Sequence, residues 1–212
     1  MNTSLRRHPL PKVIGPALFW NSHRLGIEGR WKALSSPLHR TLFESDQGIV
    51  EWHCYQPQSE VSIQISPNTS ILGYGYAEHL LMTIKPWELP IEELRWGRFV
   101  SKRDSLVWID WRGQSPQSLV FYNGVQIGHA SVGDRNIVLD EGKTSLSFEE
   151  SIVLREGFLF SNVLHMIRVF RKILPARFLQ TYECKWRSRG ILRSGQFISS
   201  TGWVIHEVVK FG

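Results

Sequence analysis

Charged side chains alternate with tryptophans in one stretch of the chain, LRWGRFVSKRDSLVWIDWRG (94–113). The loop SKRD predicts a hairpin that places Arg95 opposite Asp110 and Gly97 opposite Trp108. Because Gly97 has no side chain, we expect the indole of Trp108 to lie over it. The Arg95–Asp110 pair is either buried within an aromatic face or exposed. Losing one partner of a buried pair costs about 3–5 kcal/mol, whereas an exposed pair is worth under about 1 kcal/mol.

A second group of side chains that could transfer protons lies in GYGYAEHL (73–80). In a strand, Tyr76 and Glu78 share one face and His79 points to the other. A carboxylate that faces an apolar interior has a raised pKa and can donate a proton to a substrate. The competing interpretation is that Glu78 forms a salt bridge with an arginine.

The last predicted strand carries a third candidate carboxylate, in GWVIHEVVKF (202–211). Glu207 shares its face with Trp203 in an otherwise apolar row, and His206 points to the other face.

The sequence contains no recognisable metal or cofactor motif. Glu51 and His53 lie on one strand face, but no third ligand follows at a recognisable spacing, so no metal is predicted. The chain has no P-loop, dinucleotide fingerprint or G-x-S-x-G motif, so no cofactor is predicted either.

The elements that must position these residues are almost all β-strands, separated by Gly, Asn, Asp and Pro. Residues 1–24 are expected to form an irregular arm, and residues 25–212 a single domain. We expect an all-β, antiparallel fold, either a lipocalin-like barrel or a two-sheet β-sandwich, because closure removes exposed strand edges. The strands are predicted near 48–57, 61–66, 70–84, 94–100, 105–112, 117–122, 125–132, 135–140, 144–154, 180–188, 191–199 and 202–211.

One helix is predicted at 161–175, in the C-terminal third, with Ser161 as its N-cap and Pro175 at its end. Its polar side is basic. The helix therefore either covers the sheet or the mouth of a barrel, or makes peripheral contact with an anionic membrane.

The composition of the chain limits the classes of function that the protein can have. A chain of 212 residues with a net charge of +6 permits anionic partners, but its basic residues are scattered and no nucleic-acid motif occurs, so nucleic acid is disfavoured. The two cysteines are expected to be buried, reduced thiols. No apolar segment approaches the ~20 residues of a membrane span, and we expect a cytoplasmic protein, with membrane association as the alternative. The oligomeric state is left open.

The strand GYGYAEH, the tryptophan-rich strands and the closing GWVIHEVV resemble calycin-type proteins that include carotenoid hydratases (hydroxyneurosporene synthases) and the AttH-like group. Those proteins have a glycine–tyrosine motif followed by an acidic residue and often a histidine, matched here by Gly75, Tyr76, Glu78 and His79. The resemblance implies a lipocalin-like β architecture and a lipophilic, often isoprenoid, substrate handled without a redox cofactor.

The functional hypothesis is a protein that binds an apolar small molecule, with acid-catalysed hydration or cyclisation of an isoprenoid double bond as its possible chemistry. Asp110 or Glu78 would donate the proton, and aromatic faces would stabilise a developing carbocation. One alternative is a carrier without chemistry, and another is a carbohydrate-binding or glycoside-hydrolysing β-sandwich. The binding residues assigned to the site are Arg95, Trp96, Trp108, Tyr76, His79, Trp203 and Glu207.

Overall fold

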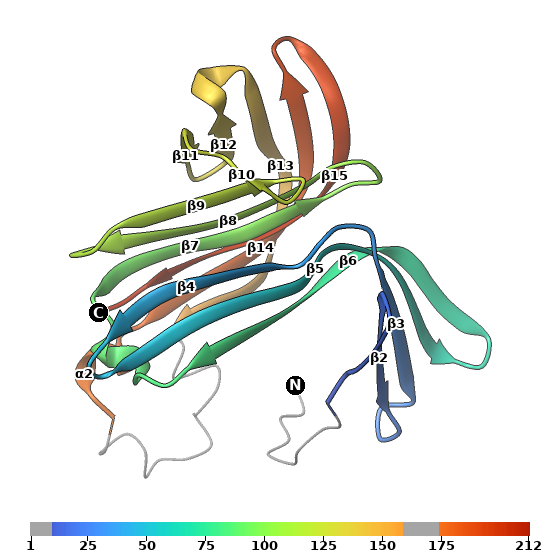
Figure 1. The fold of residues 1–212 in the computed structure, drawn as a ribbon, viewed down its shortest axis with the longest axis horizontal. Coiled ribbons are helices and arrows are strands. Elements are labelled where there is room, and N and C mark those ends of the chain that lie inside the picture. The colour runs from blue at the N-terminus through green and yellow to red at the C-terminus, as the bar shows by residue number, and fades with distance from the viewer. Residues whose placement is uncertain (1–9, 159–173) are drawn as a thin grey trace. The chain divides into compact units, whose positions relative to one another are not determined.

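A computed structural model of the chain describes residues 10–158 and 174–212, and these form antiparallel strands with very little helix (Figure 1). The expected all-β, antiparallel class is confirmed. Residues 161–173 of the predicted helix lie outside the described residues. A single-turn helix, α2 (Ala176–Leu179), follows them, and a 3-10 turn, η1 (Pro86–Glu88), follows β6. No helix in the described part of the chain is long and apolar enough to cross a membrane.

The first sheet has six strands in the order β1-β2-β3-β5-β4, and β6 also pairs with β5. The strands are β1 (Lys12–Ile14), β2 (Ala17–Ser22), β3 (Ile27–Ala33), β4 (Leu38–Ser45), β5 (Gly48–Ser66) and β6 (Thr69–Met82).

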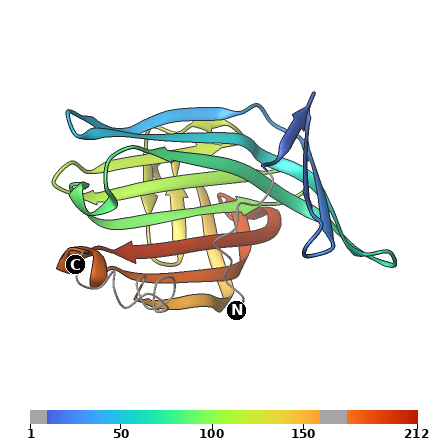
Figure 2. The same ribbon diagram turned by 90° about the horizontal axis from the view of Figure 1, so that it is seen from below.

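The second sheet has nine strands in the order β10-β9-β8-β7-β15-β14-β13-β12-β11. It curls into a half-barrel (Figures 1 and 2), which is consistent with the expected lipocalin-like architecture. The strands are β7 (Ile91–Val100), β8 (Ser105–Gly113), β9 (Gln117–Tyr122), β10 (Val125–Gln126), β11 (Ala130–Val132), β12 (Asn136–Leu139), β13 (Thr144–Phe158), β14 (Tyr182–Ser194) and β15 (Phe197–Lys210). A 3-10 turn, η2 (Asp140–Gly142), joins β12 to β13.

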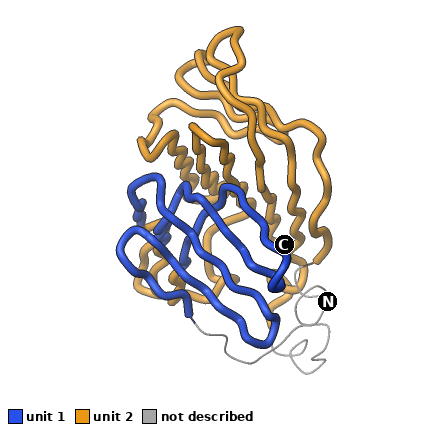
Figure 3. Tube along the Cα trace, turned by 90° about the vertical axis from the view of Figure 1, so that its right-hand side faces the viewer, with its two compact units in different colours: residues 1–40, 52–80 blue, residues 41–51, 81–212 orange. Residues whose placement is uncertain are grey.

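The chain divides into two compact units (Figure 3). Unit 1 comprises residues 1–40 and 52–80, and unit 2 comprises residues 41–51 and 81–212. The whole nine-stranded sheet belongs to unit 2. That residues 25–212 act as one domain stays a prediction.

The prediction of an irregular arm at 1–24 is wrong for its second half, where β1 and β2 form a hairpin. The turn is made at Gly15, whose positive φ of 56° suits a residue without a Cβ. Pro11 and Pro16 flank β1 without interrupting it, so the prolines limit the strand's length and do not abolish it.

The C-terminal region also differs from the prediction, because two long strands replace the three expected at 180–188, 191–199 and 202–211. The chain reverses only at Gly195, which has a φ of 57°. Gly190 and Gly202 lie opposite each other inside the ladder. A Cβ on Gly190 would come within 2.5 Å of the Phe99 ring, so this glycine permits close packing and does not make a turn.

The main core of unit 2 covers one part of the nine-stranded sheet. Trp108 and Phe148 stack there with ring centroids 5.4 Å apart. The buried members of this cluster are Phe99, Leu106, Trp108, Val120, Val132, Ile137, Leu139, Leu146, Phe148, Leu192 and Val204. Because β11 and β12 contribute to the cluster, the core holds the β11–β12 hairpin against the rest of the sheet, next to the cavity described below.

Candidate functional site

The predicted register of the β7–β8 hairpin is confirmed. Arg95 lies opposite Asp110, and Gly97 lies opposite Trp108. A Cβ built on Gly97 would be 2.3 Å from the Trp108 ring, so the indole does lie over the glycine. Trp108 is buried, and most side chains on both faces of the hairpin are buried or half-buried.

The direct Arg95–Asp110 ion pair is replaced by a chain of charges. Arg95 pairs with Glu93 (2.6 Å) and with Asp134 (2.5 Å), while Asp110 pairs with Arg112 (2.7 Å). Arg112 also reaches Glu93 at 3.1 Å, so one network links all five groups. The long arginine side chains reach along their own strand or to a neighbouring turn, which the strand register alone does not indicate. Burial alone would lower the pKa of Arg95, but its hydrogen bonds and charge interactions with the two carboxylates outweigh burial, and the pKa is raised.

A second group of predicted residues lies on the opposite face of the sheet. Glu207 is opposite Trp96 and forms an ion pair with Lys185 at 2.6 Å. Burial raises the pKa of Glu207, and the lysine counters this effect. The Lys185 ammonium also lies 5.8 Å from the centre of the Trp96 ring. Trp203 is 55% exposed, and the guanidinium of Arg187 lies 4.8 Å from its ring.

The remaining predicted residues belong to unit 1. Glu78 accepts a hydrogen bond of 2.8 Å from the indole nitrogen of Trp52. Tyr76 and Glu78 are half-buried on β6, and His79 is exposed. The predicted site residues therefore form three separate sets: Arg95, Trp108 and Asp110; Trp96, Trp203 and Glu207; and Tyr76, Glu78 and His79. Their functional roles stay predictions.

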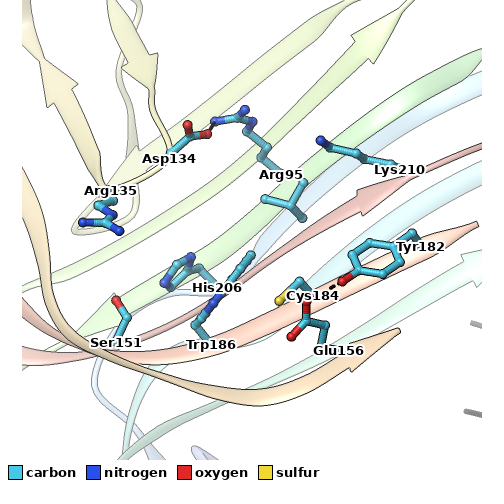
Figure 4. A pocket seen from close by; sticks show the side chains of 11 residues that line it. Arg95, Asp134, Arg135, Ser151, Glu156, Tyr182, Cys184, Trp186, His206 and Lys210 are labelled. Atoms are coloured by element: carbon cyan, nitrogen blue, oxygen red, sulfur yellow. Dashed lines mark hydrogen bonds and ion pairs between the residues drawn. The ribbon is translucent and has the colours of Figure 1, made fainter. Parts of the chain in front are cut away.

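The sheet face that carries Arg95 also carries a pocket of about 380 Å³ (Figure 4). A row of opposite residues crosses the five strands from β8 to β13 at this point, namely Asp110, Arg95, Val208, Cys184 and Glu156. The pocket is lined by Arg95, Asp134, Arg135, Ser151, Glu156, Tyr182, Cys184, Trp186, His206, Val208 and Lys210.

A chain of polar groups runs from the buried side chains of His206 and Ser188 to the exposed Ser151 in the pocket lining. His206 Nε2 is 3.0 Å from Ser188 Oγ, which is 2.8 Å from Ser151 Oγ. Ser151 reaches Ser188 because β13 is irregular between Glu149 and Ile152, where Glu150 has a φ of 50°. Such bulges re-aim side chains and are over-represented next to functional sites.

Aromatic rings enclose His206. Its ring stacks on Trp186 with centroids 5.1 Å apart, and Phe148 lies 4.6 Å away at a tilt. Burial lowers the pKa of His206 to about 4. At neutral pH the imidazole is therefore uncharged and can serve as a hydrogen-bond donor and acceptor.

Further along β13 and β14, the pocket lining carries a phenol, a carboxylate and a thiol. The Tyr182 hydroxyl donates a hydrogen bond to Glu156, and this bond raises the pKa of Tyr182 to about 12. Cys184 is buried, and burial raises the pKa of its thiol. The phenol and the thiol are thus both protonated at neutral pH. Cys54 is likewise a buried thiol outside any disulfide, as predicted for both cysteines.

Three cations and two anions line the pocket. Arg95 is neutralised by its two carboxylate partners. Among the described residues, neither Arg135 nor Lys210 takes part in a salt bridge. The two side chains are exposed, so the positive charge lies toward solvent and the aromatic surface lies toward the sheet.

Sequence reasoning placed only Arg95 of these lining residues in a site. It identified His206 as a candidate side chain but assigned it no role, and it missed Trp186 and Ser151. The turn at Gly195 indicates that β14 and β15 are neighbours, but a register shift between Leu192 and Arg193 is also needed to set Trp186 opposite His206.

These observations define an all-β protein whose nine-stranded half-barrel carries a mixed polar and aromatic pocket. No protein family and no curated protein sequence matches the chain. Seven chains of solved structures match it in three dimensions. Two are crystal structures of CghA: with Sch210972 the TM-score is 0.47, and for CghA alone it is 0.46, each at 8% identity over 92% of this chain. The chain spans 64% of the length of each CghA chain.

Proposed function

We propose that this protein binds a small molecule with an apolar body and an anionic or carbonyl oxygen, in the pocket of the nine-stranded sheet. The observation that carries the proposal is the pocket itself, where Trp186 and Val208 offer apolar surface below the cations Arg135 and Lys210. Its volume of about 380 Å³ falls within the range of small-molecule sites, which are concave, mostly apolar and fitted with a few polar groups.

The uncharged polar groups of the lining determine which ligand groups the pocket can bind by hydrogen bonds. Neutral His206 and Ser151 can exchange hydrogen bonds with a hydroxyl or carbonyl group. The cations Arg135 and Lys210 would attract an anionic head group and leave the apolar part against Trp186. This division favours an amphipathic ligand such as an isoprenoid acid.

Acid-catalysed hydration or cyclisation of an isoprenoid is the enzymatic form of the proposal. A carbocation would be stabilised by the face of Trp186 but opposed by the nearby cations Arg135 and Lys210. Tyr182, with a pKa of about 12, is a weak proton donor. These groups favour binding without chemistry, and a catalytic role for Asp110 or Glu78 stays a prediction.

The test uses two probes that differ only at one end, farnesoate and farnesol. Both are titrated into the protein by calorimetry. We expect binding of both and tighter binding of farnesoate. Trp186→Ala should weaken both by roughly tenfold or more, which corresponds to about 1.4 kcal/mol. Arg135→Gln should weaken farnesoate selectively, because farnesol has no charge for the guanidinium to attract.

A comparison with Trp203→Ala separates the pocket from the opposite sheet face. Trp203 belongs to the set that the sequence assigned to binding, yet it lies outside the pocket lining. If Trp203→Ala weakens farnesoate while Trp186→Ala does not, the pocket assignment is wrong. Incubation of the protein with farnesol, followed by mass spectrometry for a hydrated or cyclised product, tests the enzymatic form separately.

A further inference from the structure

Three histidines from three strands of unit 1 lie close together on the first sheet. His39 lies on β4, His53 on β5 and His79 on β6, and β5 pairs with both of the other strands. The rings of His39 and His53 are nearly parallel, with centroids 4.2 Å apart. The centroids of His53 and His79 are 6.1 Å apart.

The cluster lies on the outward face of β5. Trp52 and Cys54, which point to the other face, are buried, whereas His53 is half-buried and His39 is exposed. An ion from solvent can therefore reach the imidazole nitrogens. The alternation of the strand also gives His53 a carboxylate neighbour, because Glu51 precedes it by two residues on the same face.

The distances suit a metal ion. Ligand atoms of His39 and His53 lie within 4.8 Å of each other, and a carboxylate oxygen of Glu51 is equally close to the His53 ligand atom. In a tetrahedral zinc site with bond lengths of about 2.0–2.1 Å, ligand atoms are about 3.4 Å apart. Closing the ligand atoms to this separation would require rotation of the side chains, and the side chain of His39 is exposed.

We propose that His39, His53 and Glu51 bind a divalent transition-metal ion of the zinc and copper type. Imidazole nitrogens and one carboxylate form a donor set that suits these ions and suits Mg²⁺ or Ca²⁺ poorly. The site is distinct from the pocket of the nine-stranded sheet and does not depend on the proposed ligand.

Binding of the ion is expected to stabilise the first sheet. An ion held by His39 and His53 would link β4 to β5 in the sheet. An ion that binds only the folded chain raises its thermal stability. The effect should disappear at acid pH, because protonated imidazole has no lone pair for the metal.

For the test, the protein is treated with a chelator and the chelator is then removed. Binding of Zn²⁺ to this protein is measured by calorimetry. We expect one equivalent of Zn²⁺ to bind and to raise the melting temperature. His53→Gln and His39→Gln should each weaken binding by roughly tenfold or more, the lower bound expected for groups that contact the ion directly. His23→Gln removes an exposed histidine outside the cluster and serves as the matched control.

A spectroscopic readout identifies the ligands independently. Co²⁺ in place of Zn²⁺ should show the intense visible bands of a tetrahedral site in the wild type and in His23→Gln, and these bands should be lost in His53→Gln. Because His39 is exposed, the His39→Gln variant should fold normally. It therefore still tests the proposal if His53→Gln does not fold. Wild-type protein that binds no Zn²⁺, or a His39→Gln protein that binds it unchanged, would overturn the proposal.

Discussion

The buried His206 should make the stability of the protein depend on pH in a defined window. Its pKa is about 4 in the folded protein, where burial disfavours the imidazolium, and 6.5 is the ordinary value for an exposed histidine. Below pH 6.5 the unfolded chain therefore takes up a proton at this side chain that the folded protein does not. Stability attributable to His206 is fully present above pH 6.5 and is lost as the pH falls toward 4.

The size of the effect follows from the separation of the two pKa values. Between pH 7 and pH 5, proton uptake by the unfolded state lowers the free energy of unfolding by about 2 kcal/mol. The groups around the imidazole act in the same direction. Arg95, Arg135 and Lys210 outnumber Asp134 and Glu156 in the pocket, so a positive charge on His206 gains no compensation there.

The assay is urea unfolding followed by tryptophan fluorescence at pH 7, 6 and 5, for the wild type and for His206→Gln. The variant removes the titrating group and keeps an amide that can bond to Ser188. Other groups with shifted pKa values, such as Glu207 and Asp104, titrate in both proteins and cancel in the difference. We expect the wild type to lose about 2 kcal/mol more than the variant between pH 7 and pH 5. Parallel pH profiles would refute the inference that His206 is buried and neutral.

Two further substitutions test the β7–β8 hairpin. Gly97→Ala would place a Cβ 2.3 Å from the ring of the buried Trp108, and overpacking of this kind should lower the free energy of unfolding by about 1–3 kcal/mol; an unchanged urea midpoint would contradict the close approach of the indole to Gly97. Asp110→Asn removes the charge that accepts from Arg112 at 2.7 Å and should cost about 1–2 kcal/mol, measured by urea unfolding, while farnesoate binding stays unchanged. Loss of farnesoate binding without loss of stability would instead favour a direct role for Asp110 in the site.

The hairpin was predictable because its register is set locally. The loop SKRD fixes which residues of β7 and β8 are opposite, and the whole ladder follows from it. The choice of ionic partners was not predictable in the same way. Arg95 reaches Asp134, which follows it in the chain by four further strands, β8 to β11, and only the folded sheet brings the two side chains together.

The pocket was harder to predict because one residue of register decides which face a side chain occupies. Near the Gly195 turn, Ser194 lies opposite Phe197, but a bulge between Leu192 and Arg193 shifts all later pairs by one residue. A register extended from the turn without this bulge misaligns β14 with β15, and such a slip reverses the faces. The bulge has no clear signature in the sequence, so the opposition of Trp186 and His206 became visible only in the structure.

The histidine cluster escaped sequence reasoning for a related reason. His39, His53 and His79 are separated by 14 and 26 residues, intervals that match no metal-binding motif. Strand pairing ignores such intervals, since any residue on β4 or β6 can lie beside His53 if the register allows it. Spacing rules find sites built within one turn or one hairpin, and they miss sites built across a sheet.

The two faces of the sheet explain why charged residues occur among the tryptophans of the β7–β8 hairpin. Side chains alternate along a strand, so a segment that is buried on both faces must place its polar residues on one face or the other. On the pocket face Arg95 and Asp110 join a network of opposite charges, and on the other face Glu207 is held by Lys185 beside Trp96. The first face also carries the pocket lined by Arg95. A substitution of Arg95, which lines the pocket, can therefore alter both stability and ligand binding, whereas Asp110 and Glu207 lie outside the pocket lining and their substitution should act on stability.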